Sequence, residues 1–360
     1  MKKTQLLLLS IFIMISFVVA CEKDNEEVSK TQIKEDSHSQ EESNKQEQLE
    51  EDYISATVTG YNNGVNADNG MTTQIWHFDP DGETTKKVFD FETSAQYSLG
   101  YFDRKNNVVY YVKRVHTEDS YGDQIFTTDL KTGIETQLTD QLFAVNRIIP
   151  VEDQIFIVAA RKNEREDKLG SIDKKTNEIT FWRKDEDNSV ASIAVDKINK
   201  KVFISAFSMA DRDESFKTQG NGNYQMEKYT IYQVDYDLQN TKEIFAENWH
   251  IRSIMTNGEK ITALADKKYN NSKEPSMIYE YNIKTGESAL DTWTAQRLRS
   301  HSSDYSSDGK KIYGISIVDE HRGIAAYDVE SQQMELLVDT IEGNFINNIH
   351  VVKNEIKKDN

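Results

Sequence analysis

The chain has 360 residues, with 61 acidic and 43 basic side chains and a formal net charge of −18 at pH 7. This acidity argues against nucleic acid as a partner, because phosphate contacts require clustered Lys and Arg. The single cysteine excludes an internal disulfide and a zinc site built from several thiolates. The hydrophobic content of 37% and aromatic content of 10% exclude a chain that is disordered throughout.

Residues 1–20 have the pattern of a signal peptide. Lys2 and Lys3 give a positive start, and Leu6–Ala20 is a fifteen-residue stretch that is apolar apart from two serines. This stretch is too short for a comfortable membrane-spanning helix and matches the apolar region of a secretion signal.

The apolar stretch ends in Val18-Val19-Ala20-Cys21, which resembles the lipobox of bacterial lipoproteins. In that family a diacylglyceryl group is attached to the cysteine, and cleavage leaves the cysteine as the first residue. The resemblance implies that Cys21 carries acyl chains such as palmitate. It also implies that the lipid bilayer is a partner and that the protein is anchored on the extracytoplasmic face of the cell membrane. The alternative is an ordinary secretory signal followed by a chance cysteine.

Residues 21–52 are predicted to be the lipidated cysteine and an acidic, disordered tether. From residue 22 onward this segment holds twelve Asp and Glu, four Lys and no aromatic residue. It cannot bury enough apolar surface to offset the entropy of ordering. A helical spacer is the alternative for its structure, and binding of a basic partner is the alternative to a role in spacing.

From Tyr53 onward, short β-branched and aromatic segments alternate with turn residues, as strands do. A hairpin pattern occurs six times, and its turns are spaced 44 to 63 residues apart. Those turns end at residues 82, 133, 177, 240, 286 and 332. Most of them pair an Asp with a later Gly or Asn, residues that tolerate the positive φ of tight turns.

A second pattern places two apolar residues seven positions apart, with polar turn residues between them. Its six copies are Phe102/Val109, Ile148/Ile155, Val195/Val202, Ile254/Ile261, Tyr305/Ile312 and Ile349/Ile356. Each pair predicts the first and second strands of a unit, and each hairpin predicts the third and fourth. Six units of four strands predict an all-β, six-bladed β-propeller over residues 53–356, with 357–360 as a tail.

The chain ends are predicted to share the last blade. Ile349 begins a sixth unit that has no room for its remaining strands. Residues 53–60, 75–78 and 86–89 have the pattern of the missing second, third and fourth strands. One C-terminal strand and three N-terminal strands would then close the ring and remove an open sheet edge.

The segment Ser306-Ser307-Asp308-Gly309-Lys310-Lys311-Ile312-Tyr313 is similar to the WD40-like repeat of TolB-like six-bladed propellers. Weaker copies lie at residues 103–110 and 196–203. The resemblance spans nearly all of residues 53–356 and implies the fold more than the function.

The loops between blades lie on one rim in such propellers, and that rim is a usual place for ligands. His250 and His301 occupy the same register there, in two different units. Two histidines at one rim are a candidate site for a divalent metal or an anionic ligand. Trp249, Arg252 and Arg299 flank them, and Trp and Arg are typical of binding hot spots.

The third unit carries the longest insertion, residues 208–228, which we expect to be a long loop on the same rim. Asp211, Asp213 and Tyr224 within it are candidate ligand contacts, because long loops are often functional. The alternative for all these rim residues is ordinary packing or solvent exposure.

The function expected from these observations is a membrane-anchored, non-enzymatic binding module without a cofactor. Its rim would bind an envelope protein, a peptide or a glycan. No phosphate loop, nucleotide-binding glycine pattern or His-Glu-x-x-His motif occurs. One alternative is a metal-dependent polysaccharide lyase, since the resemblance to oligogalacturonate lyases implies rim histidines around a divalent metal. Another is a sensor that regulates a membrane kinase or transporter.

Overall fold

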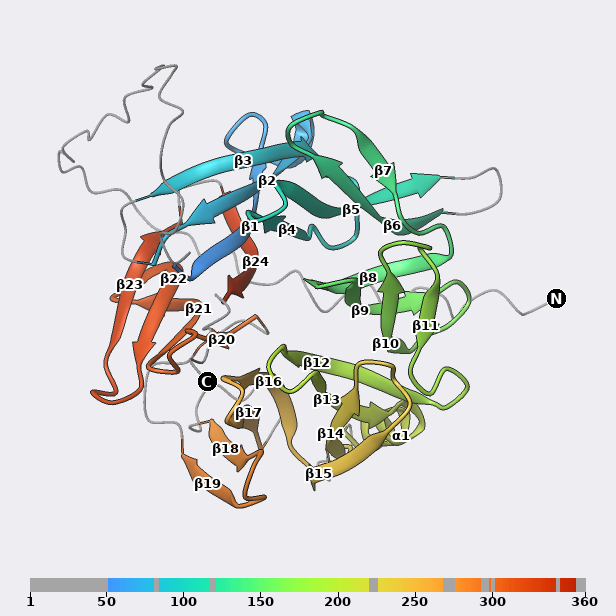
Figure 1. Cartoon of the computed structure of the whole chain (residues 1–360), viewed down its shortest axis with the longest axis vertical. Coiled ribbons are helices and arrows are strands. Elements are labelled where there is room, and N and C mark those ends of the chain that lie inside the picture. The colour runs from blue at the N-terminus through green and yellow to red at the C-terminus, as the bar shows by residue number, and fades with distance from the viewer. Residues whose placement is uncertain are drawn as a thin grey trace. The chain divides into compact units, whose positions relative to one another are not determined.

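The computed structural model describes residues 51–80, 84–116, 121–219, 226–267, 276–292, 298, 302–340 and 344–353. In this part of the chain, six antiparallel sheets of four strands each stand in a ring (Figure 1). This arrangement confirms the predicted all-β, six-bladed β-propeller. Residues 1–50, which include Cys21, and the tail at 357–360 lie outside the described residues. Within the described ranges, no helix has the length and apolar character needed to cross a membrane.

We number the blades from the sheet that begins with β4, so that blade 6 contains both chain ends. The innermost strands of blades 1 to 6 are β4 (Gly100–Asp103), β8 (Leu142–Val151), β12 (Asn188–Asp196), β16 (His250–Thr256), β20 (Asp304–Tyr305) and β24 (Asn344–Val352). The second strands are β5 (Val108–His116), β9 (Gln154–Arg161), β13 (Lys201–Ser208), β17 (Lys260–Asp266), β21 (Lys311–Val318) and β1 (Tyr53–Tyr61).

The outer half of each blade is formed by its third and fourth strands. The third strands are β6 (Tyr121–Asp129), β10 (Asp167–Asp173), β14 (Tyr229–Asp235), β18 (Met277–Asn282), β22 (His321–Asp328) and β2 (Met71–Phe78). The fourth are β7 (Glu135–Gln137), β11 (Ile179–Phe181), β15 (Thr241–Glu247), β19 (Ser288–Thr292), β23 (Met334–Asp339) and β3 (Thr85–Glu92). A short 3₁₀ turn, η1 (Ala67–Asn69), lies between β1 and β2.

The apolar residues seven positions apart lie in hairpins, as predicted. The pairs that are direct cross-strand partners are Phe102 with Val109, Val195 with Val202, and Tyr305 with Ile312. The pairs that begin at Ile148 and Ile254 lie in equivalent hairpins but are offset in register. Ile356 lies outside the described residues.

The repeated turn pattern joins the third strand of a blade to its fourth. Asp129 Oδ1 accepts hydrogen bonds of 2.8 and 2.9 Å from the backbone N–H groups two and three residues later, and Gly133 follows with φ of 71°. Asp173 makes the same two bonds in blade 2, before Asn177 with φ of 60°. Gly and Asn tolerate this backbone conformation, which is why the pattern is visible in the sequence.

Blade 6 closes the ring in the predicted way. Strand β24 pairs antiparallel with β1, with Ile349 opposite Ala56, and β2 and β3 complete the sheet (Figure 1). The strand begins at Asn344 rather than at Ile349. The pairing covers the edge of β1 that would otherwise be open to other chains.

The core consists of six apolar clusters, one at each interface between neighbouring blades. Leu142 and Ile157 belong to the cluster between blades 1 and 2. Tyr53, Ile75 and Val109 belong to the cluster between blades 6 and 1. Because every interface has such a cluster, each blade is buried on both faces and the closed ring stabilises the whole domain.

Polar contacts also join blade 6 to blade 1. The backbone N–H of Gly100 donates to Thr57 Oγ1 (2.8 Å), and that of Phe102 donates to Ser55 Oγ (2.9 Å). A Cβ at position 100 would lie 2.5 Å from Cγ1 of Ile75, so the close approach of the blades requires glycine there.

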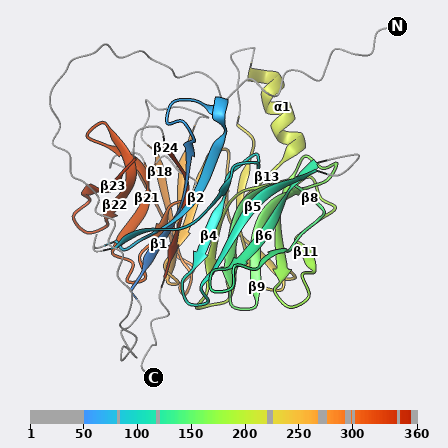
Figure 2. The same cartoon turned by 90° about the horizontal axis from the view of Figure 1, so that it is seen from above.

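The insertion at residues 208–228 differs from the expected long loop. It contains helix α1 (Met209–Gln219), which stands on one rim of the domain beside β13 (Figure 2). Ser208 caps this helix, since its Oγ accepts a hydrogen bond from the backbone N–H of Asp211 (3.1 Å). Ser followed three residues later by an acidic residue is a local helix-start signal, and it is present in the sequence at Ser208 and Asp211.

Candidate functional site

The main cavity of the described structure lies in the central channel. It has a volume of about 1030 Å³ and is lined by residues of all six innermost strands. It reaches the turns that follow these strands, such as Lys197–Asn199 after β12 and Asn257–Glu259 after β16. The cavity therefore opens at the rim where the innermost strands end, and α1 stands on the opposite rim because it joins β13 to β14.

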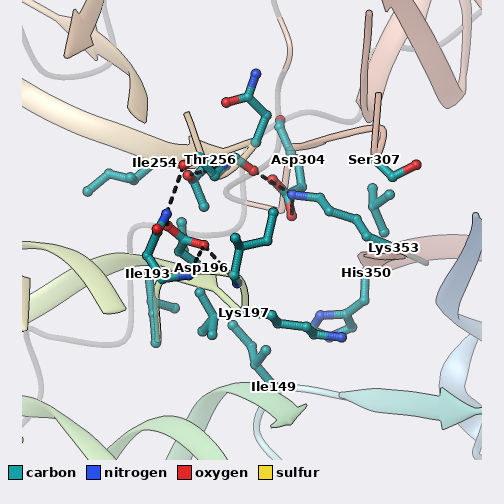
Figure 3. Close-up of a pocket in the computed structure, with 18 of the residues that line it drawn as sticks. Ile149, Ile193, Asp196, Lys197, Ile254, Thr256, Asp304, Ser307, His350 and Lys353 are labelled. Atoms are coloured by element: carbon teal, nitrogen blue, oxygen red, sulfur yellow. Dashed lines mark hydrogen bonds and ion pairs between the residues drawn. The ribbon is translucent and has the colours of Figure 1, made fainter. Parts of the chain in front are cut away.

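The middle of the channel is partly apolar. Ile149, Ile193 and Ile254 come from three neighbouring blades and line the cavity (Figure 3). Ile193 and Ile254 are nearly fully buried, which leaves only a small part of each side chain at the cavity surface. A wall of this kind favours a ligand with apolar surface, and polar groups beside it select the ligand's orientation.

One polar bridge connects three blades across the channel. Lys353, just after β24, has its Nζ 2.9 Å from Asp304 Oδ2 and donates a 2.5 Å hydrogen bond to the carbonyl oxygen of Thr256 (Figure 3). These partners belong to blades 5 and 4. These contacts connect the end of β24 to blades 4 and 5, and Lys353 supplies an opposite charge to Asp304.

Asp196 shapes the opening of the cavity. Its Oδ1 accepts hydrogen bonds from the backbone N–H groups of Ile198 and Asn199, both at 3.0 Å. The Asn199 side chain donates both to Asp196 Oδ2 (2.6 Å) and to the carbonyl oxygen of Gly258 in the next blade (2.8 Å). Asp196 thus orders two neighbouring turns, as Asp commonly does in turns.

The side of the channel formed by β4, β8 and β24 carries Tyr101, Arg147 and His350. The rings of Tyr101 and His350 lie edge to face, with centroids 5.2 Å apart. Burial lowers the pKa of Arg147 to about 10. Burial, and secondarily the charge of Arg147, lowers the pKa of His350 to about 3. His350 is therefore neutral at physiological pH, whereas Arg147 keeps its charge.

The predicted rim residues of blade 4 lie at the start of β16, at the other end of the strand from the cavity opening. His250 is half-buried and its ring lies against Tyr229, with centroids 5.6 Å apart. Trp249 is half-buried beside Phe245 (6.0 Å between centroids), and Lys267 Nζ lies 5.9 Å from its ring. None of these residues lines the central cavity.

Arg252, also predicted to contact a ligand, is only 7% exposed. Its Nε lies 2.8 Å from Asp266 Oδ2, its Nη1 donates to the carbonyl oxygen of Leu298 (2.7 Å), and its Nη2 donates to Ser276 Oγ (2.9 Å). These contacts join β16 to the adjacent strand and to two further segments. A structural role accounts for the burial of this charge.

The predicted contacts in the insertion lie on α1. Asp211 is exposed in the first turn, and Asp213 forms a two-pronged ion pair with Arg165, with both N–O distances 3.0 Å. This pairing lowers the pKa of Asp213. Tyr224, His301 and Arg299 lie outside the described residues, so the predicted pairing of His250 with His301 stays a prediction.

A metal site is not evident in the described part of the chain. No group of three or more His, Cys, Asp or Glu side chains among these residues is placed to hold a metal ion. His301 is not among them. The predicted divalent metal therefore also stays a prediction.

Sequence reasoning missed the residues of the channel. Arg147 and His350 are the ionisable residues of two innermost strands whose other residues are apolar or asparagine, and that contrast was the available signal. It was not decisive, because a strand pattern does not say which face of an innermost strand meets the channel.

Comparison with known proteins supports the fold. No protein-family model matches the chain, and no curated protein matches it in sequence. Two solved structures are similar: TolB from Acinetobacter baumannii (TM-score 0.54, 15% identity, 84% of this chain and 67% of TolB) and a chain of a nidogen–laminin complex (TM-score 0.51, 12% identity, 83% of this chain and 97% of that one).

The six closed blades define the class of this protein, a six-bladed β-propeller. The arrangement of its blades is similar to that of the TolB propeller. At these identities the likeness concerns the fold alone.

Proposed function

We propose that this protein is a lipid-anchored binding protein of the extracytoplasmic face of the cell membrane, and that its ligand enters the central channel. The observation that carries the proposal is the cavity of about 1030 Å³ at the centre of the ring. Ligand pockets are commonly about 300–1,000 Å³, concave and partly apolar, with a few polar groups that orient the ligand. The ligand classes expected from the sequence are an envelope protein segment, a peptide or a glycan.

The channel is a better candidate than the opposite rim for a physical reason. Arg252 is already engaged by three partners and Asp213 by Arg165, so these groups would have to exchange existing bonds for a ligand. The channel instead contains polar groups beside a partly apolar wall that includes the half-buried Ile149, and covering the apolar surface that is still accessible would favour binding.

Photo-crosslinking in intact cells tests the ligand site. A photo-reactive residue is placed at Lys284, an exposed position at the cavity opening, and as a control at Leu290, an exposed position on the outer strand of the same blade. We expect a discrete adduct from position 284 and none from position 290. Absence of an adduct at 284, or the same adducts from both positions, would overturn the proposed site.

The anchor is tested separately. Cys21→Ala removes the thiol that the lipobox resemblance assigns to lipidation. Loss of two acyl chains removes stable anchoring, because each buried CH₂ contributes about 0.8 kcal/mol. We expect the variant to leave the membrane fraction while its circular dichroism spectrum stays that of the wild type. A variant that remains in the membrane fraction would contradict lipid anchoring through this residue.

A further inference from the structure

We propose that Arg147 is the anion-binding residue of the channel and that the ligand carries an oxyanion, either a carboxylate or a phosphate. The inference rests on the proposed function, because it assigns a chemical class to the ligand of that same channel. Arg147 is a charged side chain that forms no ion pair among the described residues.

A β-bulge presents Arg147 to the channel. The register of β8 against β9 shifts between Val145 and Arg147, so that Asn146 is the extra residue. Val145 and Ile148 both belong to the core cluster between blades 1 and 2 although they are three residues apart. Regular alternation would place them on opposite faces of the strand. The bulge brings both into the core and leaves Arg147 and Ile149 to line the cavity, which is a known use of bulges near functional sites.

Arg147 has little compensation for its charge. Among the described residues, its only hydrogen bond runs from Nη1 to the carbonyl oxygen of the adjacent Asn146 (2.8 Å), and it forms no ion pair with a carboxylate. A guanidinium has five N–H donors, so most of them remain for another partner. Burial alone accounts for its lowered pKa, and no described acidic group offsets it.

The carboxylates that line the cavity are occupied elsewhere or lie at its exposed edge. Their positions are as follows: Asp304 with Lys353 (2.9 Å), Glu152 with Lys200 (3.2 Å), Asp308 with Ser306 (2.6 Å), Asp196 within its turn, and Glu259 exposed at the rim. A buried charge without a partner costs free energy. Arg147 is half-buried, so it loses part of its hydration without gaining an opposite charge, and a ligand anion would supply that charge.

The neighbours of Arg147 are suited to the same ligand group. His350 Nε2 lies 2.7 Å from Asn348 Nδ2, which is a donor, so the neutral imidazole carries its proton on Nδ1. Nδ1 has no hydrogen-bond partner among the described residues. The channel wall of β4, β8 and β24 thus offers a guanidinium and an imidazole N–H. Arginine binds carboxylate and phosphate through two parallel N–H bonds, which accounts for Arg rather than Lys here.

Titration of the full-length protein with small anions tests the proposal. The probes are succinate and inorganic phosphate, with succinamide as the neutral counterpart of succinate, and binding is measured by calorimetry and by thermal shift. We expect saturable binding of at least one anion and none of succinamide. The anion that binds distinguishes a carboxylate ligand from a phosphorylated one.

Three variants locate the binding. Arg147→Gln should weaken anion affinity about 10- to 100-fold, the range for a lost hydrogen bond to a charged group. Arg147→Lys should retain part of the affinity, because it keeps the charge without the two-pronged geometry. Arg165→Gln, at an exposed ion pair beside α1, is the control and should bind like the wild type.

Stability supplies a second readout. Without anion, Arg147→Gln should have a thermal midpoint equal to or higher than that of the wild type, because it removes a half-buried charge that has no opposite charge beside it among the described residues. Unchanged affinity in Arg147→Gln, or equal binding of succinamide, would overturn the inference. If the adduct at position 284 persists unchanged in Arg147→Gln cells, the channel still binds a ligand and the anionic class is wrong. If the wild type gives no adduct there, the proposed function itself fails.

Discussion

His350→Gln isolates one source of acid sensitivity in the propeller. The imidazole lies in the channel wall beside Tyr101 and near Arg147, and its pKa of about 3 is well below the ordinary 6.5. In the unfolded chain the same imidazole becomes protonated as the pH falls below 6.5, whereas in the folded protein it stays neutral until about pH 3. The unfolded state then binds more protons, so the free energy of unfolding decreases as the pH falls through this window.

The magnitude follows from these two pKa values. One pKa unit corresponds to about 1.4 kcal/mol. Lowering the pH from about 7.5 to about 5 therefore decreases the free energy of unfolding by about 2 kcal/mol, if the imidazole is fully shielded from water in the folded protein. His350 is half-buried and faces the channel, so water screens part of this effect. Over this pH range we expect the free energy of unfolding of the wild type to fall by about 1–2 kcal/mol, and we expect this decrease to be absent in His350→Gln.

Urea unfolding at the two pH values measures this difference, because the free energy of unfolding extrapolates linearly to water. Other groups also titrate in this range: burial lowers the pKa of His77 and raises that of Asp167 to about 6, with opposite effects on stability. Their contributions are common to both proteins and cancel in the comparison. His321→Gln is the matched substitution at an exposed histidine outside the channel. Equal acid sensitivity in wild type and His350→Gln would show that His350 titrates freely in the folded protein, and would refute the reasoning.

Three further predictions concern the closed ring. Deleting residues 345–360 removes nearly all of β24 and uncovers β1, so we expect a large drop in the thermal midpoint and concentration-dependent aggregation; an unchanged midpoint would count against closure. Gly323→Ala would place a Cβ 1.8 Å from the carbonyl oxygen of Val338. We expect the free energy of unfolding, measured with urea, to fall by about 1–3 kcal/mol or more. An unchanged value would show that the backbone adjusts freely. Arg252→Met removes the ion-pair partner of the buried Asp266 and should lower the free energy of unfolding by about 3–5 kcal/mol. Adding Asp266→Leu should restore part of this stability. A mild effect of the single change would argue against a structural role for Arg252.

The fold was predictable because its signals are local and repeated. Asp129 with Gly133 and Asp173 with Asn177 show the same turn chemistry in two blades, and two further blades repeat it at Asn282 and Asp328. Pairs such as Val195 and Val202 mark the hairpins between first and second strands. A turn is determined by a few adjacent residues, so its chemistry can be read directly from the sequence.

The candidate site was less predictable, because its residues are distant in sequence. His250 and Arg252 were chosen for their register and residue type, yet their side chains pack beside Tyr229 and pair with Asp266. Burial and partners depend on neighbouring strands, and a single strand pattern does not contain that information. The helix in the insertion differs from these residues, because its start is marked locally by Ser208 and Asp211 and is therefore predictable from the sequence.

The sequence by itself determined the number of blades and the closure of the last blade by β24 and β1, whereas the membrane-targeting segments stay a prediction. These features depend on periodic patterns and on motifs a few residues long. Only the tertiary structure decided which polar residues meet in the channel. The bulge at Asn146 changes which face of β8 carries Arg147, and the ring brings Arg147 to His350 from the far end of the chain. One extra residue in a strand reverses the side on which every following side chain lies, and that is why the charged wall of the channel appears only in the folded protein.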